Sequence, residues 1–341
     1  ATIGGMASTR ASGTNAVRYG TMKENIVNLT CVLPDETGTV IRTNRRAKKS
    51  SAGYDLTSLM VGSEGTLGII TEITLKLYGV PECITAAVCS FPDLNSAALC
   101  VSTCIQLGVS LSRIELMDEH AIRAVNQYSK LTLDDSKPML LFEFVGSEQG
   151  VQEQVDMVRE IAQDEYGASD FVFKKKEEER QILWRARHMA YLASLNLKPG
   201  YKGMITDVCV PISKLAECIV ATKEDVDASG LLYTVIGHVG DGNFHVVLVL
   251  DEHDEEQMRK AHEINDKLVK RAISMDGTCT GEHGVGHGKM DYLLMEHGPD
   301  SVELMRTIKK AVDPLNIMNP GKIMASVEEV KRFREAHPQQ L

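Results

Sequence analysis

The chain has 341 residues, of which 43% are hydrophobic and 25% are charged, and its formal net charge at pH 7 is −10. A soluble chain of this length is expected to form two domains, each with its own core. The negative charge argues against general nucleic-acid binding, and the sequence has no run of about 18 apolar residues that could span a membrane.

The eight cysteines are not spaced for a disulfide framework or an iron–sulfur cluster. No Cys-x-x-Cys pair occurs, and most of the cysteines lie inside apolar strand or helix patterns. This pattern predicts buried thiols in a reducing compartment.

Residues 1–80 are glycine-rich and alternate short strands with turns. The pattern predicts strands at residues 25–33 and 39–43, joined by a Pro-Asp-Glu-Thr-Gly turn, and a third strand at the end of residues 62–77. The first residue is Ala1, with no initiator Met and no signal or transit peptide. We therefore expect the chain to be a fragment of a longer protein.

The pattern changes after Pro81, where predicted strands begin to alternate with predicted helices. This alternation predicts an α+β domain in which helices cover one face of a sheet. The predicted strands are residues 85–91, 114–117, 139–145, 171–174 and 205–210. The predicted helices are residues 94–107, opened by Asp93, then 118–128, 151–166, 177–195, a helix from 211 and a helix over 255–275.

Two histidines flank a predicted hairpin turn. Asp241-Gly242 lies between two β-rich runs, which is a strong signal for a two-residue turn. In that register His238 lies opposite His245, with the two Cβ atoms about 4.5–5.5 Å apart, so that both rings could bind one ion. The alternative is a cross-strand histidine pair with no ligand.

A second segment adds two more groups that bind metals. Gly281-Glu282-His283-Gly284 offers a carboxylate and a further imidazole on a glycine-rich loop. Two histidines, a glutamate and a spare histidine are together typical of a catalytic metal site. The alternative for this loop is a plain glycine turn.

Small residues in three segments indicate places where a backbone could approach a phosphate closely. These segments contain Gly4-Gly5, Ser12-Gly13 and residues 62–68. Backbone N–H groups in such loops form anion-binding nests. Because none of the segments matches a dinucleotide or Walker fingerprint, ordinary turns remain an equal alternative.

Two further residues have both a structural and a functional interpretation. Arg187, on a predicted helix after Trp184, could be an inward-facing clamp for a carboxylate or one partner of a salt bridge with Glu177–Glu179. Asn319 lies in an Asn-Pro-Gly turn, which by itself only predicts the end of a helix.

Taken together, these motifs resemble the FAD-dependent D-2-hydroxy-acid dehydrogenase family, and within it the cytochrome-type D-lactate dehydrogenase branch of mitochondria. The resemblance extends over residues 1–324. The segments that carry it are residues 4–6, 11–20, 61–68, 184–188, 206–211, 238–245, 281–284 and 319–322.

The resemblance implies a division of the chain into four parts. Residues 1–81 would be the C-terminal portion of a vanillyl-alcohol-oxidase-type FAD-binding domain whose N-terminal portion is missing. Residues 82–310 would be a ferredoxin-like substrate domain that carries the metal site. Residues 311–325 would return to the flavin, and residues 326–341 would be a polar tail, helical or frayed.

The resemblance also implies roles for individual residues. His238, His245 and Glu282 would bind a divalent metal, zinc or manganese. His283 would be the catalytic base, Arg187 the carboxylate clamp and Asn243 a substrate contact. The residues facing FAD would be Gly4, Gly5, Ser12, Gly13, Gly65, Ile70 and Asn319.

The implied activity is oxidation of D-lactate, or a similar small D-2-hydroxy acid, with hydride transfer to FAD. Electrons would pass to cytochrome c or an electron-transfer flavoprotein, and the family places the protein in the mitochondrion. The alternatives are a D-2-hydroxyglutarate or glycolate dehydrogenase, and a truncated, non-catalytic isoform that cannot hold FAD. A second substrate carboxylate would require another buried cation, for which Lys202 is the candidate. A zinc hydrolase is disfavoured because no His-Glu-x-x-His motif occurs.

Overall fold

The structure is a computed structural model that describes residues 1–169 and 171–337, and the chain divides into two compact units. The first unit consists of Ala1–Gly13, Tyr19–Gly79 and the residues from Cys279 onward; the second consists of Thr14–Arg18 and Val80–Thr278. Residues 279–310, which the sequence-based division places in the substrate domain, thus group with the first unit. The last four residues of the predicted polar tail lie outside the described residues.

A three-stranded antiparallel sheet, in the order β2-β1-β3, forms the centre of the first unit. All three strands were predicted, and the turn between the first two is held by the Asp35 carboxylate, which accepts the N–H groups of Thr37 and Thr39. The strands are β1 (Ile26–Val32), β2 (Val40–Arg42) and β3 (Ile69–Leu75). The helices are α1 (Ile3–Ser8), α3 (Met22–Asn25), α4 (Leu56–Met60), α12 (Met290–Val312) and α13 (Val327–Ala336).

Residues from both ends of the chain build the core of the first unit. Leu29 and Cys31 of β1 are fully buried, and Ile308 and Val312 of α12 pack against the same cluster. The burial of these apolar side chains is the main force that closes this unit. The helix α12 is kinked at Gly298, where φ is 76°.

The second unit contains an eight-stranded sheet in the order β7-β4-β6-β5-β10-β11-β8, with β9 also paired to β11, and every pairing is antiparallel. The strands are β4 (Cys83–Ser90), β5 (Leu111–Met117), β6 (Met139–Gly146), β7 (Val172–Lys174), β8 (Lys202–Ile205), β9 (Val208–Cys209), β10 (Leu232–His238) and β11 (Asn243–Leu250). The helices are α5 (Leu94–Gln106), α6 (Glu119–Ser129), α7 (Glu148–Glu160), α8 (Glu177–His188), α9 (Ala190–Asn196), α10 (Leu215–Ser229) and α11 (Glu255–Ser274). A short helix α2 (Ala16–Tyr19) and the helical turns η1 (Ile161–Glu165), η2 (Ile212–Lys214) and η3 (Val239–Asp241) complete the described elements.

Side-chain caps set the starts of several of these helices. The carboxylate of Asp93 accepts the N–H of Ser96 at 2.7 Å, and the carboxylate of Asp118 accepts the N–H of Ala121 at 2.8 Å. An N-cap of this kind satisfies a backbone donor that the helix itself leaves unpaired. The predicted opening of the first of these helices by Asp93 is confirmed.

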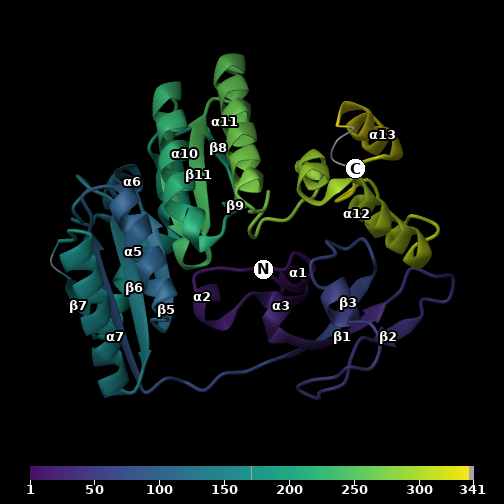
Figure 1. Cartoon of the computed structure of the whole chain (residues 1–341), viewed down its shortest axis with the longest axis horizontal. Coiled ribbons are helices and arrows are strands. Elements are labelled where there is room, and N and C mark those ends of the chain that lie inside the picture. The colour runs from purple at the N-terminus through teal and green to yellow at the C-terminus, as the bar shows by residue number, and fades with distance from the viewer. Residues whose placement is uncertain (170, 338–341) are drawn as a thin grey trace. The chain divides into compact units, whose positions relative to one another are not determined.

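Helices cover both faces of the large sheet, so the prediction of a single covered face was wrong. Met139 and Leu141 of β6 share one apolar cluster with residues of α6, α8 and α9. Phe142 and Phe144 alternate with them and are also fully buried, so they face the other side. Figure 1 shows α5 and α7 on the near side of the sheet that contains β6. A strand covered on both faces is buried along its length, and residues 139–145 of β6 are all buried.

Two long predicted helices are irregular. The predicted helix 177–195 is broken at Met189 into α8 and α9. The predicted helix 151–166 begins earlier, at Glu148 after the N-cap Ser147, and its last turn widens into the π-helical turn η1. Both differences concern local backbone geometry that apolar periodicity does not report.

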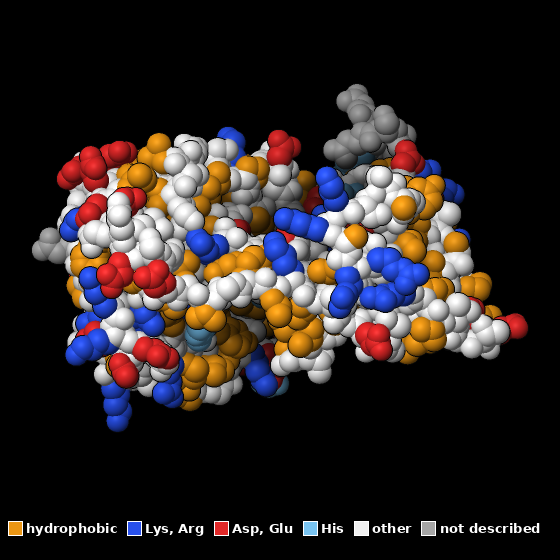
Figure 2. Space-filling model, turned by 90° about the horizontal axis from the view of Figure 1, so that it is seen from below, with side chains coloured by type: hydrophobic (Ala, Val, Ile, Leu, Met, Phe, Trp, Pro, Cys, Tyr) orange, Lys and Arg blue, Asp and Glu red, His pale blue; other side chains and the backbone are white. Residues whose placement is uncertain are grey.

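All eight cysteines are free thiols, as predicted. None of the described helices is long and apolar enough to cross a membrane. On the face shown in Figure 2, Lys and Arg side chains lie among acidic and hydrophobic ones rather than in one continuous basic surface.

Candidate active site

The hairpin that carries the two histidines has a longer turn than predicted. β10 and β11 pair His238 with Asn243 and Ile236 with His245, so the predicted pairing of His238 with His245 was wrong. The connection is the four-residue segment 239–242, which contains the turn η3. A Cβ on Gly240 would lie 2.5 Å from Ile114 Cγ2, so this turn packs tightly against the core of its unit.

The two imidazoles meet nevertheless, because they are diagonal neighbours on one face of the hairpin. Their ring centroids are 5.7 Å apart and the ring planes are nearly perpendicular, at 83°. Nδ1 of His245 lies 3.0 Å from the carbonyl oxygen of Thr206. Nδ1 of His238 lies 2.8 Å and 2.9 Å from the two carboxylate oxygens of Glu115. A histidine whose Nδ1–H is held by an acceptor binds a metal through Nε2.

Glu115 also binds the predicted clamp. Arg187 Nη2 lies 2.8 Å from Glu115 Oε2, and Glu115 is completely buried. The guanidinium of Arg187 and the Nδ1 group of His238, both within hydrogen-bond distance, compensate for the burial of this carboxylate. Within the described residues, the Nε atom of Arg187 is buried without a hydrogen-bond partner. Arg187 therefore has donor capacity beyond its ion pair, as a carboxylate clamp requires.

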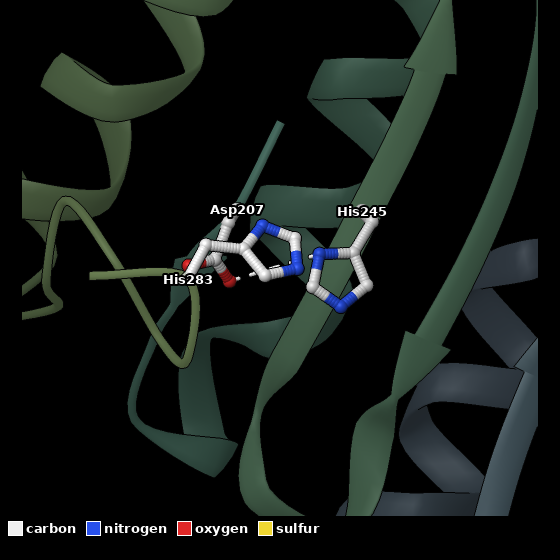
Figure 3. A group of neighbouring side chains, drawn as sticks. All are labelled: Asp207, His245 and His283. Carbon is white, nitrogen blue, oxygen red and sulfur yellow. Dashed lines mark ion pairs between the residues drawn. The ribbon is translucent and has the colours of Figure 1, made fainter. Parts of the chain in front are cut away.

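A second buried carboxylate, Asp207, supports the other half of the group. Figure 3 shows its side chain beside the His245 ring, and its Oδ1 lies 3.6 Å from Nδ1 of His245. The amide of Asn243 donates to the same oxygen at 2.8 Å and to the carbonyl of Val208 at 2.7 Å. Oδ1 of Asn243 is buried and has no partner among the residues that the structure describes.

Burial and neighbouring charge also act on His188, the last residue of α8. Partial desolvation of its ring, and then the nearby cations Arg113 and Arg187, lower the pKa of His188 below its ordinary value. The surroundings of Arg187 therefore favour a neutral imidazole beside it.

The first unit holds the loop that contains Glu282 and His283. The side chain of His283 is 39% exposed and that of Glu282 is 14% exposed, and His283 Nε2 lies 3.8 Å from Glu282 Oε1. Gly284 and Gly286 have φ values of 82° and 50°, so this loop depends on left-handed backbone that glycine adopts readily. Figure 3 also draws the His283 side chain on this loop.

The residues predicted to face FAD lie in different local structures. Gly4 and Gly5 belong to the short helix α1 rather than to a loop, and Thr2 caps it by accepting the N–H of Gly5. Gly65 has a φ of 72°, and nothing lies within 4 Å of the position that a Cβ would take. Such a glycine leaves its backbone open to close approach by a ligand.

The remaining predicted flavin contacts divide into strand, extended chain and turn. Ile70 is in β3, paired with Cys31, and is half-buried. Ser12 and Gly13 are in the extended segment after α1, where Gly13 has a φ of 148°. Asn319 has a φ of 43°, and its Nδ2 donates to the carbonyl of Glu64 at 2.7 Å. Asn319 therefore does more than end a helix, because it ties its turn to the 62–68 loop.

Sequence reasoning missed two residues at the centres of these groups, Glu115 and Glu64. Glu115 lies in a strand where every other residue except Arg113 is buried, and a charged residue in an otherwise apolar strand was a signal that could have been used. Glu64 has a φ of 49°. A glutamate between glycines in a tight turn was the corresponding signal there.

Comparison with known proteins places these features in context. The family model described as FAD linked oxidases, C-terminal domain, matches residues 80–323, and the model described as FAD binding domain matches residues 1–44.

Curated relatives are 34% to 51% identical to this chain. The mitochondrial D-lactate dehydrogenase (cytochrome) of Arabidopsis thaliana is 51% identical over 95% of this chain and 56% of the relative. The probable mitochondrial D-lactate dehydrogenase of Danio rerio is 50% identical over 95% of this chain and 65% of the relative. Glycolate oxidase subunit GlcD of Bacillus subtilis (strain 168) is 34% identical over 95% of this chain and 68% of the relative. The chain thus spans less than two thirds of the length of the first two relatives.

Solved structures share the fold at low identity. p-Cresol methylhydroxylase with substrate bound has a TM-score of 0.73 at 18% identity, covering 94% of this chain and 68% of that one. Alkyldihydroxyacetonephosphate synthase has a TM-score of 0.66 at 18% identity, covering 93% of this chain and 58% of that one. These similarities confirm the predicted fold class, a mixed helix-and-sheet FAD-oxidase fold.

Proposed function

Because this chain belongs to the FAD-linked oxidase family, we propose that it oxidises a small D-2-hydroxy acid to the 2-oxo acid, with D-lactate as the first candidate. The observation that carries the proposal is the cluster around Glu115, in which one buried carboxylate holds both His238 and Arg187. A metal-binding imidazole and a guanidinium fixed by one residue suit a substrate with adjacent hydroxyl and carboxylate groups.

FAD suits the glycine-rich segments of the first unit. We propose Gly4, Gly5, Ser12, Gly13, Gly65, Ile70 and Asn319 as its contacts, and the open space beside Gly65 is consistent with this role. When bound, FAD supplies the acceptor for the hydride that leaves C2 of the substrate.

A divalent metal, zinc or manganese, suits the donor set His238, His245 and Glu282. The Nδ1 atoms of both histidines are held by acceptors, Glu115 and the Thr206 carbonyl, which is the usual support of metal-binding imidazoles. When bound, the metal supplies Lewis acidity that lowers the pKa of the substrate hydroxyl.

The residues of the chain account for the remaining steps. Arg187 binds the substrate carboxylate through guanidinium N–H groups beyond its ion pair with Glu115, and so fixes which face of C2 is presented. His283 accepts the hydroxyl proton as C2 loses its hydride, which leaves the 2-oxo acid. Asn243 Oδ1, buried and unpaired among the described residues, contacts the substrate.

Substrates with one carboxylate fit the second unit better than those with two. Lys202, the cation considered for a second carboxylate, is exposed on β8. This disfavours D-2-hydroxyglutarate. Glycolate, which also has one carboxylate, is the second candidate, because the Bacillus subtilis relative is named as a glycolate oxidase subunit.

The names of the relatives also support an electron acceptor and a compartment. The Arabidopsis thaliana and Saccharomyces cerevisiae relatives are named as cytochrome-type and mitochondrial. We propose cytochrome c, or an electron-transfer flavoprotein, as the acceptor and the mitochondrion as the location.

An absorption spectrum of the purified chain, with FAD and a divalent metal added, tests the proposal. Anaerobic addition of D-lactate should bleach the visible flavin bands, whereas L-lactate should not. The rates of bleaching by glycolate and by D-2-hydroxyglutarate show how these alternative substrates compare with D-lactate. A chain that binds no FAD would support the non-catalytic alternative. Bleaching by both lactate enantiomers would contradict the assigned role of Arg187.

His283→Ala tests the base. The variant should still bind the metal but should lose turnover by about 10²-fold or more. His262→Ala, which changes an exposed histidine of α11, is the control and should retain turnover. Unchanged turnover in His283→Ala would remove His283 from the role of base.

A further inference from the structure

Three sequence segments of the first unit meet at Glu64. Its carboxylate accepts the backbone N–H of Val285 through Oε1 and that of Gly286 through Oε2, each at 2.8 Å. Its carbonyl accepts Nδ2 of Asn319 at 2.7 Å, and its own N–H donates to the carbonyl of Ser8 at 2.8 Å. The 62–68 loop, the loop of Glu282 and His283, and the turn of Asn319 are thus joined at one side chain and its backbone.

We propose that Glu64 is a positioning residue, which fixes the loop of Glu282 and His283 against the glycine loop of the FAD-binding part. This inference rests on the proposed function and adds to it a residue that contacts neither metal nor substrate. Because Glu64 holds the two amides next to Gly284, it determines where the preceding ligand and base can lie.

The geometry requires a carboxylate. Each oxygen of Glu64 accepts one backbone N–H, and charge-assisted bonds of this type are roughly twice as strong as neutral ones. A carboxamide has one acceptor oxygen and would direct its NH₂ group at the other backbone N–H, so that two donors would face each other. A shorter carboxylate could not reach both amides.

The backbone around Glu64 is adapted to this contact. Glu64 itself has a φ of 49°, between Gly62 at 83° and Gly65 at 72°. On the facing loop, Gly284 has a φ of 82°, and a Cβ there would lie 2.8 Å from Glu64 Oε1. A non-glycine residue held in the left-handed region costs on the order of 1–2 kcal/mol, which indicates that neighbouring contacts maintain this conformation.

Other hydrogen bonds to the anchored loop hold its carbonyl groups. Ile323 N–H donates to the carbonyl of Gly286 at 2.8 Å, Lys289 N–H to the carbonyl of Val285 at 3.2 Å, and the Thr280 hydroxyl to the carbonyl of Gly284 at 3.1 Å. Glu64, by contrast, holds N–H groups of the loop. Loss of the carboxylate would therefore free one side of the loop without unfolding the unit.

The experiment compares the wild-type chain with Glu64→Gln, and uses Glu72→Gln as the matched control. Glu72 is an exposed glutamate of β3 in the same unit, and its carboxylate accepts the Thr30 hydroxyl at 3.0 Å. Amide hydrogen exchange of residues 280–289 and the affinity for Co²⁺, read from its visible bands, are measured with FAD present. Flavin reduction by D-lactate is followed in a single turnover.

Glu64→Gln should increase exchange at Val285 and Gly286 and weaken Co²⁺ binding by about 10-fold or more. It should slow flavin reduction while FAD content stays at the wild-type level, and Glu72→Gln should match the wild type throughout. Glu64→Asp, which keeps the charge and tolerates positive φ, serves if Glu64→Gln does not fold, and should show the same changes.

If the Glu64 variants have the same amide exchange, Co²⁺ affinity and flavin reduction as the wild type, the inference is overturned. Loss of FAD with unchanged exchange at Val285 and Gly286 would also overturn it, because Glu64 would then act on the flavin directly. If the wild-type chain neither binds Co²⁺ nor reduces FAD, the proposed function fails instead, and that result is read from the wild type alone.

Discussion

Glu115 Oε1 lies 2.8 Å from Nδ1 of His238, and this contact determines how the histidine presents its ring. A carboxylate at Nδ1 favours the tautomer that carries the proton there, so Nε2 is the nitrogen suited to a metal. The second oxygen of Glu115 lies 2.8 Å from Nη2 of Arg187. One side chain of β5 thus orients two groups that the sequence assigns to different tasks.

Glu115→Gln should weaken divalent metal binding by about 10- to 100-fold. The carboxamide can accept from only one of the two partners, so it cannot fix both His238 and Arg187. Competition with a chromophoric chelator measures the Zn²⁺ affinity. Glu143→Gln is the matched control, because Glu143 is also buried and ion-paired, with Arg113 at 3.3 Å. Equal losses in both variants would contradict the prediction.

Lys309→Met should destabilise the first unit by about 3–5 kcal/mol. Lys309 is buried, pairs with the buried carboxylate of Asp313, and donates to the carbonyls of Thr66 and Met318 at 2.8 Å and 2.7 Å. Removal of the ammonium leaves a buried charge without its partner. Urea unfolding measures the loss.

Two further variants show whether that loss arises from the buried charge. Lys310→Met changes the exposed neighbouring lysine and should alter the free energy of unfolding by less than about 1 kcal/mol. The double variant Lys309→Met with Asp313→Asn should recover part of the loss. A double variant no more stable than Lys309→Met would contradict the explanation.

Asp118→Asn should change the pH dependence of stability. Burial raises the pKa of Asp118 to about 7, from an ordinary value of 3.8. The folded state then binds this proton more tightly than the unfolded state, so the contribution is fully present below pH 3.8 and is lost as pH rises through 7.

Asparagine keeps the acceptor oxygen for the N–H of Ala121 and cannot ionise. The stability of Asp118→Asn relative to wild type should therefore increase between pH 5 and 7, by up to roughly 1.4 kcal/mol per pH unit. Thermal unfolding at a series of pH values measures the difference. The control is Asp93→Asn, at the exposed N-cap of α5, which should leave the pH dependence of stability unchanged. A stability difference between Asp118→Asn and wild type that does not vary with pH would refute the prediction.

Gly242→Ala should cost more stability than Gly230→Ala. Both glycines have positive φ, 79° and 70°, so each alanine carries a backbone cost of roughly 1–2 kcal/mol. A Cβ on Gly242 would also overlap the carbonyl oxygen of Val210, whereas nothing lies within 4 Å of one on Gly230. Chemical denaturation compares the two variants, and equal losses would show that the turn before Asn243 can move.

The sequence predicted elements better than it predicted contacts. Apolar alternation located most strands of both sheets, and Asp93 marked a helix start, because these features depend on neighbours in the chain. The predicted strand 205–210 was wrong, because the chain there forms two strands, β8 ending at Ile205 and β9 at Val208–Cys209. The hairpin register was missed because Gly240 packs against Val17 and Ile114, which are distant in sequence. A turn rule that uses only local residues cannot include that packing.

The candidate site shows the same limit. The residue types at His238, His245 and Arg187 were recognisable as chemistry. The structure of the second unit brings His238 and Arg187 to Glu115, and His245 beside His238. Glu115 and Glu64 were not predicted, since neither belongs to a ligand-spacing pattern. Their importance depends on pairing across elements, which becomes visible only after folding.

The discontinuity of the first unit has a consequence for biosynthesis. Its core joins Leu29 and Cys31 to Ile308 and Val312, so about 280 further residues must be made after Cys31 before these contacts can form. The second unit is nearly continuous in sequence and can fold while the ribosome is still translating, since domains generally fold as units during synthesis. Until then the apolar side chains of β1, β2 and β3 remain uncovered. Contacts between residues so far apart in the sequence also form slowly. Chaperone dependence should therefore lie in residues 19–79 of the first unit rather than in the second unit.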